Sequence, residues 1–372
     1  MMIYESRKLG ITFTVLDPDP RAPAGPLADT FIRGGLYDRE ALGKAAESSD
    51  VLTYDIEHID TDSLARLEDE GRRIYPSPAC LASIQDKLEQ KRLLRHAGIP
   101  VPDFEPLPAL GPGSPHFTPP FPPPWVQKAR TGGYDGRGVF VVRSEADMAD
   151  LISGETMAEE LVEIRKELAV MVVRGPDGAA AVYPVTEMVF DPEANICTRV
   201  VAPADIPETL RHRAEEIAFE TARALGIVGA AGIELFLDGR DRILVNEAAP
   251  RPHNSGHYTI EACATSQFEQ HIRAVSGLPL GSTELYRPAV MLNLLGASPG
   301  DTSAAGTGPP VIEGLDELLG IPGASLHFYG KAVCRPGRKM GHITVTAPSP
   351  EEALEKADRI EKIVRIYGPG ER

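Results

Sequence analysis

Runs of apolar residues divide the first hundred positions into alternating strand and helix segments. Short runs rich in β-branched and aromatic residues predict strands at residues 11–16, 51–56 and 73–75. Between these runs, apolar residues recur with helical spacing at residues 39–46 and 62–70. Strands that alternate with helices in this way predict an α/β domain with a doubly wound parallel sheet.

A long helix and a proline-rich connector follow. Ser77 and Pro78 have the form of an N-cap followed by proline in the first helical turn, so we predict a helix from there to His96. Residues 106–124 contain too many prolines for regular structure and predict an extended connector. We therefore expect an N-terminal domain at residues 1–98.

The rest of the chain is rich in strand patterns, which predict a largely antiparallel sheet and give this part an α+β character. The predicted strands are residues 168–173, 180–185, 196–201, 289–295 and 341–347, and the predicted helices are residues 146–152, 205–225 and 350–364. We divide this part into a central domain at residues 99–285 and a small β-rich C-terminal domain at residues 286–372.

One loop of the central domain combines glycine with positive charge. Residues 128–138 read Lys-Ala-Arg-Thr-Gly-Gly-Tyr-Asp-Gly-Arg-Gly. Glycines let backbone N–H groups approach a polyphosphate closely, and Lys128, Arg130 and Arg137 supply countercharge. Apolar runs on both sides predict a β-hairpin within a lid at about residues 125–154. Taken alone, the loop fits an ordinary turn equally well, because it matches neither standard phosphate-loop motif.

Two glutamates are predicted to face each other across a second hairpin. Strand patterns at residues 228–237 and 242–247 flank Asp-Gly-Arg-Asp, and Asp-Gly suits a tight turn. Glu234 and Glu247 then lie nearly opposite, where like charges are destabilising unless something compensates them. A Mg²⁺ ion held by carboxylates and substrate phosphates would do so. The alternative for an isolated pair is that one glutamate simply points to solvent.

The loop after Glu247 gathers further polar side chains. Residues 248–257 read Ala-Ala-Pro-Arg-Pro-His-Asn-Ser-Gly-His. Functional groups concentrate on irregular loops of this kind. Arg251, His253 and Asn254 together could bind a small oxyanion, although a single histidine is more often structural.

Composition and charge limit the classes of partner. The 372 residues are too many for one ordinary core, and the formal net charge of −16 argues against a general nucleic-acid binder, so any phosphate-bearing partner should be small. The four cysteines are scattered without a C-x-x-C pair, which favours a reducing cytoplasm over a disulfide framework or a zinc site. We expect no membrane span, because no apolar run approaches the required length of about 18 residues.

In this order, the motifs resemble the ATP-grasp superfamily and, within it, the N5-carboxyaminoimidazole ribonucleotide synthases. The resemblance rests on residues 130–138 (RTGGYDGRG), 246–257 (NEAAPRPHNSGH) and 335–342 (RPGRKMGH), with shorter matches at 51–58, 85–91 and 159–162. Together these matches cover nearly the whole chain. The first two separate this family from biotin carboxylase and D-alanine ligase. The resemblance implies an ATP-grasp fold in which ATP lies between two subdomains.

The resemblance also implies roles for individual residues. Adenine would lie against residues 159–162, Glu167 would hold the ribose, and Glu234 and Glu247 would bind Mg²⁺ or, in its place, Mn²⁺. The residues implied to contact the nucleotide are Lys87, Lys128, Gly133, Gly136, Glu159, Glu160, Leu161, Val162, Glu167, Asn246 and Glu247.

The remaining residues would serve the other two substrates, bicarbonate and 5-aminoimidazole ribonucleotide. Arg251, His253, Asn254 and Lys331 would form the catalytic site for bicarbonate and carboxyphosphate. The ribonucleotide would bind Tyr134 and Asp135 of the lid and Arg338 and Lys339 of the tail. The implied enzyme is a ligase of de novo purine biosynthesis and a homodimer. Bicarbonate attacks the γ-phosphoryl group to make carboxyphosphate, whose carboxyl group passes to the exocyclic amine.

The chain departs from the family pattern at its start. Members open with a strand and a turn that reads like Gly-Gly-Gly-Gln-Leu-Gly-Arg-Met, and residues 1–5 resemble the sequence after that arginine. We expect the natural protein to begin upstream, because such a loop would help to bind the ribonucleotide phosphate. Asp55 also stands where the family commonly has glutamate. Two alternatives stay open: another ATP-grasp ligase, and an ATP-binding protein that is inactive without that loop.

Overall fold

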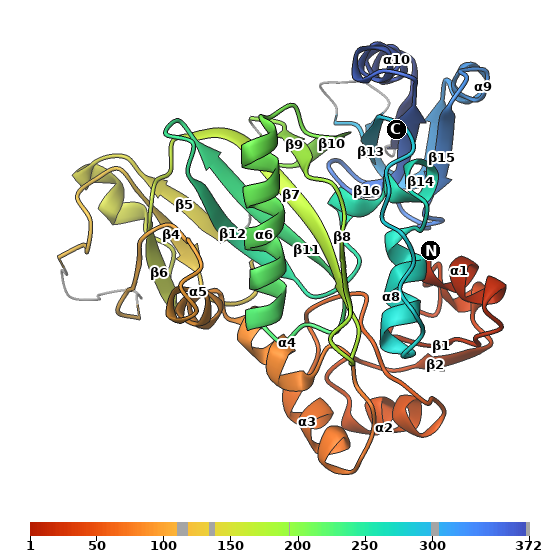
Figure 1. Ribbon diagram of the computed structural model, residues 1–372, viewed down its shortest axis with the longest axis horizontal. Coiled ribbons are helices and arrows are strands. Elements are labelled where there is room, and N and C mark those ends of the chain that lie inside the picture. The colour runs from red at the N-terminus through yellow and green to blue at the C-terminus, as the bar shows by residue number, and fades with distance from the viewer. Residues whose placement is uncertain (110–117, 134–137, 193, 299–304, 370–372) are drawn as a thin grey trace.

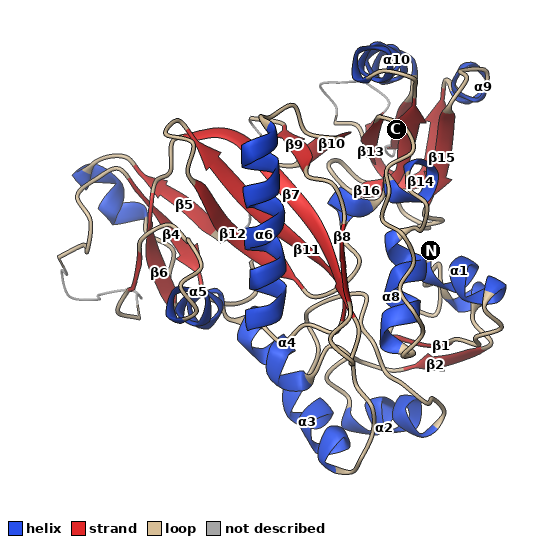
Figure 2. Ribbon diagram, in the orientation of Figure 1, coloured by secondary structure: helices blue, strands red, loops and turns tan. Residues whose placement is uncertain are grey.

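The computed structural model describes residues 1–109, 118–133, 138–192, 194–298 and 305–369 (Figure 1). A large sheet occupies the middle of the molecule, and Figure 2 shows its strands in red. A smaller sheet lies at one end of the molecule, and the C-terminal strands lie at the other end (Figure 1). The helices α2, α3 and α4 of the N-terminal part lie below the large sheet in this view.

The N-terminal part combines short strands with helices. Its elements are α1 Met2–Lys8, β1 Thr14–Asp17, η1 Gly25–Leu27, β2 Thr30–Arg33, α2 Arg39–Glu47, α3 Thr61–Asp69, α4 Pro78–Gln85 and α5 Lys87–His96. β1 and β2 pair in parallel, as predicted for this domain. Leu42, Tyr54, Leu64, Ile74 and Leu81 are among the residues of its core.

Two of the strands predicted in this part are wrong. The segments around Leu52 and Ile74 meet only in one isolated parallel bridge between these two residues. Farther along, the side-chain amide of Gln85 donates to the carbonyls of Glu57 and Ile59, both at 2.8 Å. Just beyond the predicted strand at residues 51–56, a side chain thus satisfies these two backbone carbonyls.

The single helix predicted from Ser77 to His96 is two helices. The chain breaks at Asp86, whose backbone is extended (φ −106°, ψ 107°) and whose carboxylate accepts a hydrogen bond from the N–H of Leu88 at 2.9 Å. Because this aspartate caps α5, it also ends α4. The break places Lys87, the first residue of α5, beside the large sheet.

The predicted lid hairpin is confirmed and belongs to a four-stranded antiparallel sheet. Its strands are β3 Phe104–Pro106, β4 Trp125–Ala129, β5 Val139–Val142 and β6 Thr156–Glu160, in the order β3-β6-β4-β5. β4 and β5 form the hairpin, with Trp125 opposite Val142. The helix predicted at residues 146–152 is only the 3₁₀ helix η2 Glu145–Asp150, because Leu151 (φ −58°, ψ 143°) leaves helical geometry.

A nine-stranded antiparallel sheet runs through the central and C-terminal parts. Its strands are β7 Ile164–Arg174, β8 Ala180–Val182, β9 Thr186–Phe190, β10 Cys197–Ala202, β11 Gly229–Asp238, β12 Ile243–Ala249, β13 Ala289–Leu295, β15 Ala324–Phe328 and β16 Lys339–Thr346. The order is β12-β11-β7-β9-β10-β13-β16-β15, with β8 beside β7, so β12 is an edge strand. The sheet continues past residue 285, and the domain boundaries stay predictions.

Helices cover both faces of the central part of this sheet. They are α6 Glu208–Ala224 on one face, and α7 Thr259–Ala262 and α8 Gln267–Val275 on the other, with the turn η3 Asn254–Gly256 before α7. Ala214 and Ile217 of α6 pack against Leu168 and Val170 of β7, whereas Met171 shares a core with α7 and α8. Successive residues of a strand point to opposite faces, so the buried stretch of β7, residues 168–173, is apolar on both faces. The amphipathic helix predicted at residues 205–225 is confirmed.

The C-terminal part adds a second, two-stranded sheet and two helices. Its further elements are β14 Ala305–Glu313, α9 Leu315–Leu319, α10 Pro350–Ile363 and β17 Arg365–Pro369, with β14 and β17 antiparallel. The strands predicted at residues 289–295 and 341–347 and the final helix are confirmed. β14 was not predicted, because Pro309 and Pro310 argue against a strand and are tolerated only at an edge. Within the described residues, no helix combines the length and apolar character needed to cross a membrane.

Candidate functional site

A β-bulge arranges the polar side chains of the hairpin β11–β12. Leu235 lies opposite Val245, but the register then shifts, so that Glu234 lies opposite Glu247 and Asn246 is the extra residue. Regular pairing would place Glu247 on the opposite face, against α6, because side chains alternate along a strand. The bulge instead turns Glu247 to the face of Glu234. The predicted pairing of the two glutamates is confirmed, although the turn alone would not have produced it.

The two carboxylates have different neighbours. The ammonium of Lys87 contacts Glu247, whereas Asn246 Nδ2 donates to Glu234 Oε2 at 3.3 Å and His253 Nε2 lies 3.5 Å from Glu234 Oε1. Burial raises the pKa of Glu234, and the nearby negative charges raise it further. Burial opposes ionisation of Glu247 as well, but the contact with Lys87 holds the pKa of that carboxyl below its usual range.

This donor set fits a hard divalent cation. Glu247 is 39 % exposed, and burial together with the neighbouring negative charges raises the pKa of Glu234 opposite it. Mg²⁺ is commonly held by one or two carboxylates, water and substrate phosphates. Across the described part of the chain, no group of three or more His, Cys, Asp or Glu residues forms a metal site. A cation here would therefore need ligands from the substrate or from water.

Lys128 joins the two sheets. Its ammonium, on β4, donates to Glu159 Oε1 of β6 at 2.6 Å and to Asn246 Oδ1 of β12 at 3.1 Å. Glu167 lies on β7 opposite Phe236, and burial raises the pKa of this glutamate to about 7. The Lys128 ammonium is 5.9 Å from the centre of the Phe236 ring. The fold thus brings together the residues predicted for phosphates, ribose and metal.

The segment predicted to contact adenine follows directly along β6. The Glu160 carboxylate lies 3.8 Å from the Arg242 guanidinium, Leu161 is partly buried and Val162 is buried. The side chain of Glu159 points toward Lys128, so this residue would offer adenine its backbone rather than its carboxylate.

The loop after β12 folds back over β11. A Cβ atom on Gly232 would lie 2.5 Å from Cβ of His253, so the histidine packs directly on this glycine. The amide of Gln267 accepts from the His253 N–H and donates to its carbonyl, both at 2.8 Å. Arg251 Nε lies 2.8 Å from a carboxylate oxygen of Glu57. The loop therefore has a defined shape beside Glu234.

The tail residues approach from the C-terminal part. Asn254 and Asn293 of β13 exchange two amide hydrogen bonds of 2.8 Å, which join the loop to this part. Lys331 donates to the carbonyl of Lys339 at 2.7 Å. Arg338 donates to a backbone carbonyl within its own turn at 2.6 Å. This hydrogen bond does not connect Arg338 to the carboxylates of Glu234 and Glu247.

Not every predicted residue can be placed. Tyr134, Asp135 and Gly136 lie outside the described residues. Gly133, which is described, is partly exposed at the end of the loop that follows β4.

Other residues support the site in ways that the sequence does not show. Arg130, expected to supply countercharge to a phosphate, binds Asp86 through Nε at 3.1 Å from each carboxylate oxygen, which ties the lid loop to the start of α5. Gln267 and Lys91 were assigned no role. Lys91 belongs to a motif that we noted at residues 85–91, but its complete burial cannot be read from the residue type.

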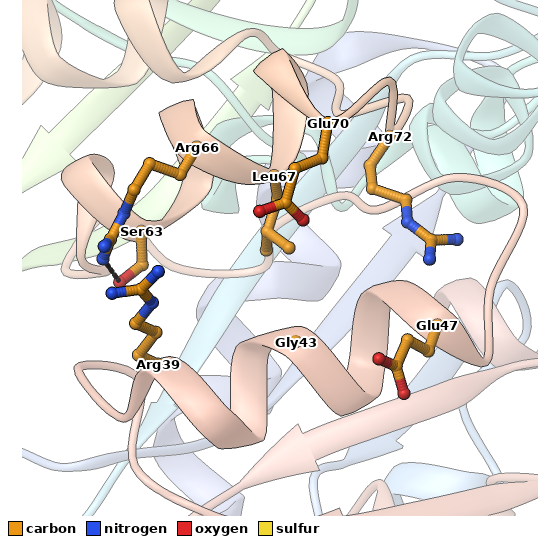
Figure 3. Close-up of a pocket in the computed structure, with 8 residues that line it drawn as sticks. All are labelled: Arg39, Gly43, Glu47, Ser63, Arg66, Leu67, Glu70 and Arg72. Carbon is orange, nitrogen blue, oxygen red and sulfur yellow. Dashed lines mark hydrogen bonds between the residues drawn. The ribbon is translucent and has the colours of Figure 1, made fainter.

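A surface pocket lies apart from this site, between α2 and α3 (Figure 3). Arg39, Arg66 and Arg72 line it together with Glu47 and Glu70. Because cations and carboxylates nearly balance there, the pocket does not select an anionic or a cationic ligand, and we assign it no function.

Known families match the chain along most of its length. Residues 1–85 match the ribonucleotide synthetase preATP-grasp domain, residues 92–268 the ATP-grasp domain, and residues 289–356 the phosphoribosylaminoimidazole carboxylase C-terminal domain. The N5-carboxyaminoimidazole ribonucleotide synthase of Synechococcus elongatus is 40 % identical over 99 % of this chain and 92 % of its own. That of Bacillus subtilis is 38 % identical over 96 % of this chain and 90 % of its own.

Solved structures agree with these relatives. The N5-carboxyaminoimidazole ribonucleotide synthetase of Thermotoga maritima is 50 % identical, covers 99 % of this chain and 96 % of its own, and superposes with a TM-score of 0.87. The Aspergillus clavatus synthase, solved with ADP and 5-aminoimidazole ribonucleotide, is 35 % identical, covers 97 % of this chain and 94 % of its own, and has a TM-score of 0.85. The chain therefore belongs to the ATP-grasp superfamily and, within it, to the N5-carboxyaminoimidazole ribonucleotide synthase family.

Proposed function

We propose that this protein uses ATP and bicarbonate to carboxylate the exocyclic amine of 5-aminoimidazole ribonucleotide, a step of de novo purine biosynthesis. The observation that carries the proposal is the similarity, over nearly the full length of the chain, to N5-carboxyaminoimidazole ribonucleotide synthases. One of these was solved with ADP and the ribonucleotide. The juxtaposition of Lys87, Lys128, Glu234, Glu247 and Asn246 supports it, because these groups suit a nucleotide phosphate with its cation.

Mg²⁺ would be held by Glu234 and Glu247. When bound, the ion would neutralise charge on the phosphates and polarise the γ-phosphoryl group. Lys87 contacts Glu247, so it lies close enough to bind a phosphate oxygen beside the metal ligands. Lys128 approaches from the other sheet, between Glu159 and Asn246. Lys87 and Lys128 thus supply cations from two sides of the site. This arrangement suits phosphoryl transfer, which depends mainly on position and charge neutralisation.

The proposed chemistry proceeds in two steps. A bicarbonate oxygen attacks the γ-phosphorus and the bond to ADP breaks, which produces carboxyphosphate. The carboxyl group then passes to the amine nitrogen, phosphate leaves and the nitrogen loses a proton. Arg251, His253 and Asn254 would hold the oxyanions of bicarbonate and carboxyphosphate, with Lys331 beside them. Gln267, which fixes the His253 backbone, would keep this loop in position before the substrate binds.

The ribonucleotide would bind between the lid and the tail. Tyr134 and Asp135 are proposed to face its aminoimidazole, and Arg338 and Lys339 its phosphate. These roles rest on the motif match, and the Asn254–Asn293 contact supports them by joining the bicarbonate loop to the C-terminal part.

The test is ADP release by the purified chain with Mg²⁺-ATP, bicarbonate and 5-aminoimidazole ribonucleotide, each omitted in turn. We expect turnover only when all are present. Nucleotide binding without any dependence on the ribonucleotide or bicarbonate would reject the proposal and favour an inactive ATP-binding protein. Turnover with a different amine acceptor would instead favour another ATP-grasp ligase.

We also infer a homodimer in a reducing, cytoplasmic setting. The four cysteines are all free and buried, which fits a reducing compartment, where disulfides are rare. Sedimentation equilibrium tests the assembly, and a single species of monomer mass at micromolar concentration would contradict it.

A further inference from the structure

The ammonium of Lys91 is buried where the two sheets meet. Lys91 lies on α5, and its Nζ is 2.7 Å from Glu159 Oε2 on β6, with both side chains only 2 % exposed. The same ammonium donates to the carbonyl of Val245 on β12 at 3.3 Å. An isolated charge is very costly to bury, so a lysine in this position needs a carboxylate partner.

Glu159 is shared between two ammonium groups. Its second oxygen accepts from Lys128 at 2.6 Å, and Lys128 also reaches Asn246 of the metal-site hairpin at 3.1 Å. Burial alone would raise the pKa of Glu159, but the two ammonium groups hold it below its ordinary value. Two cations around one carboxylate leave a net positive charge, and Lys128 is the more exposed of the two, with 12 % of its side chain exposed against 2 % for Lys91.

Lys91 also supports the edge of the large sheet. Its contact with Val245 immediately precedes Asn246 and Glu247 along β12. On the other side of that pair, Gln90 accepts from the N–H of Ala248 at 3.2 Å and donates to its carbonyl at 3.4 Å. Neighbouring residues of α5 thus satisfy the edge strand on both sides of the two residues that face the nucleotide site.

We propose that Lys91 is a positioning residue for nucleotide binding, which acts by sharing Glu159 so that the charge of Lys128 remains available to the phosphates of ATP. Without Lys91, Glu159 would have Lys128 as its single ammonium partner and would hold it away from the nucleotide. This inference rests on the phosphate-binding role proposed for Lys128.

The test is a double-mutant cycle on the full chain, with ADP affinity measured by calorimetry in the absence of ribonucleotide and bicarbonate. Lys91→Met should weaken ADP binding at least about tenfold, as expected for removal of a group that orients a ligand-binding residue. It should leave the KM for the ribonucleotide unchanged. In a Lys128→Met background, the same substitution should have little further effect on ADP affinity. Unchanged ADP affinity in folded Lys91→Met, or an equal loss in both backgrounds, would overturn the proposal.

A second variant separates positioning from folding. Lys91→Met alone leaves a carboxylate with one partner in the interior, whereas Lys91→Met combined with Glu159→Gln removes both charges. If Lys91 acts by sharing Glu159, the double variant should bind ADP more tightly than Lys91→Met alone, since Lys128 is then free of the carboxylate. A double variant that binds ADP as weakly as Lys128→Met would refute this role, even if Lys91→Met does not fold.

The same experiments keep the two proposals distinct. If the wild type binds ADP but shows no ribonucleotide-dependent turnover, the proposed function fails while the cycle still tests Lys91. If turnover is present and the cycle shows no coupling, the inference about Lys91 fails alone.

Discussion

At the scale of single residues, burial determines how much each charge contributes. Lys91 and Glu159 are almost completely enclosed, whereas Glu247 keeps 39 % of its side chain exposed. A buried ion pair is costly to break from one side, but an exposed carboxylate can exchange its partner for a ligand. The Lys91–Glu159 pair therefore suits a supporting role, and the Glu247 carboxylate suits binding of a metal ion or a phosphate-bound cation.

The assignment of Glu247 leads to a direct prediction. Glu247→Gln removes one of two carboxylates proposed to bind Mg²⁺, so turnover should fall more than about 100-fold, since even groups behind a metal ligand cost 10–100-fold. ADP release at saturating Mg²⁺ measures this. Glu208→Gln, on the exposed start of α6, is the matched control and should be silent. Substantial activity in Glu247→Gln would contradict the ligand assignment.

Two buried histidines of a cluster of three rings predict a dependence of stability on pH. The ring centroids of His342 lie 4.7 Å from those of His257 and 4.5 Å from those of His327. Burial lowers the pKa of His342 to about 3 and that of His257 well below its ordinary value. Below about pH 6.5 the unfolded chain binds protons that these folded imidazoles do not, so stability is full above that pH and decreases as the pH falls.

The size of this effect can be isolated by substitution. When the pH is lowered from 7.5 to 5.5, each histidine that stays neutral in the folded state should reduce the unfolding free energy by about 1.4 kcal/mol. In urea titrations at both pH values, His342→Gln should therefore lose about 1.4 kcal/mol less than the wild type. The readout is the difference between the two pH values, which cancels any general destabilisation by the substitution. Equal losses would show that His342 is not kept neutral in the folded state.

At the scale of elements, the hairpin β11–β12 shows how a local irregularity builds the site. The bulge at Asn246 sets Glu247 on the face of Glu234. Gly232, two residues before Glu234, leaves room for His253 on that same face. The hairpin thus supplies two carboxylates and the surface on which the bicarbonate loop rests.

Adding a methyl group to this surface should reduce activity. Gly232→Ala would place Cβ 2.5 Å from His253 Cβ and force the histidine away from Glu234. A displacement of about 1 Å can cost about 10²-fold in rate, and we expect a loss of kcat of that order. Gly43→Ala on α2 is the matched control, because its Cβ would meet nothing within 4 Å. Steady-state kinetics of both variants checks this, and equal activities would argue against a role for the His253 position.

At the scale of the whole molecule, the central and C-terminal parts are joined by a continuous sheet and by side chains. β10 pairs with β13 across the predicted domain boundary. Arg199 of β10 forms ion pairs with Asp358 at 3.0 Å and Glu361 at 2.5 Å, both on α10. The acids are 56 % and 38 % exposed, which limits what these pairs contribute.

Because the acids paired with Arg199 are largely exposed, removing these ion pairs should have a small effect on stability. Arg199→Leu should reduce the unfolding free energy by no more than about 1 kcal/mol and leave ADP affinity unchanged. Urea titrations provide the measurement, with Arg223→Leu, whose partner Glu220 lies in its own helix, as the matched variant. A loss of several kcal/mol specific to Arg199→Leu would mean that the two parts depend on this ion pair rather than on the sheet.

The sequence alone determined the features that depend on local patterns. The strands of the lid hairpin, the helix at residues 205–225 and the strands at residues 289–295 and 341–347 follow from apolar periodicity. The predicted turn pointed to the glutamate pair, and the motifs pointed to the family. Tertiary structure decided the rest. It reduced two predicted strands to one bridge between Leu52 and Ile74, split one helix at Asp86 and shifted the register at Asn246. It also buried Lys91 against Glu159, because burial and long-range pairing depend on residues that are distant along the chain.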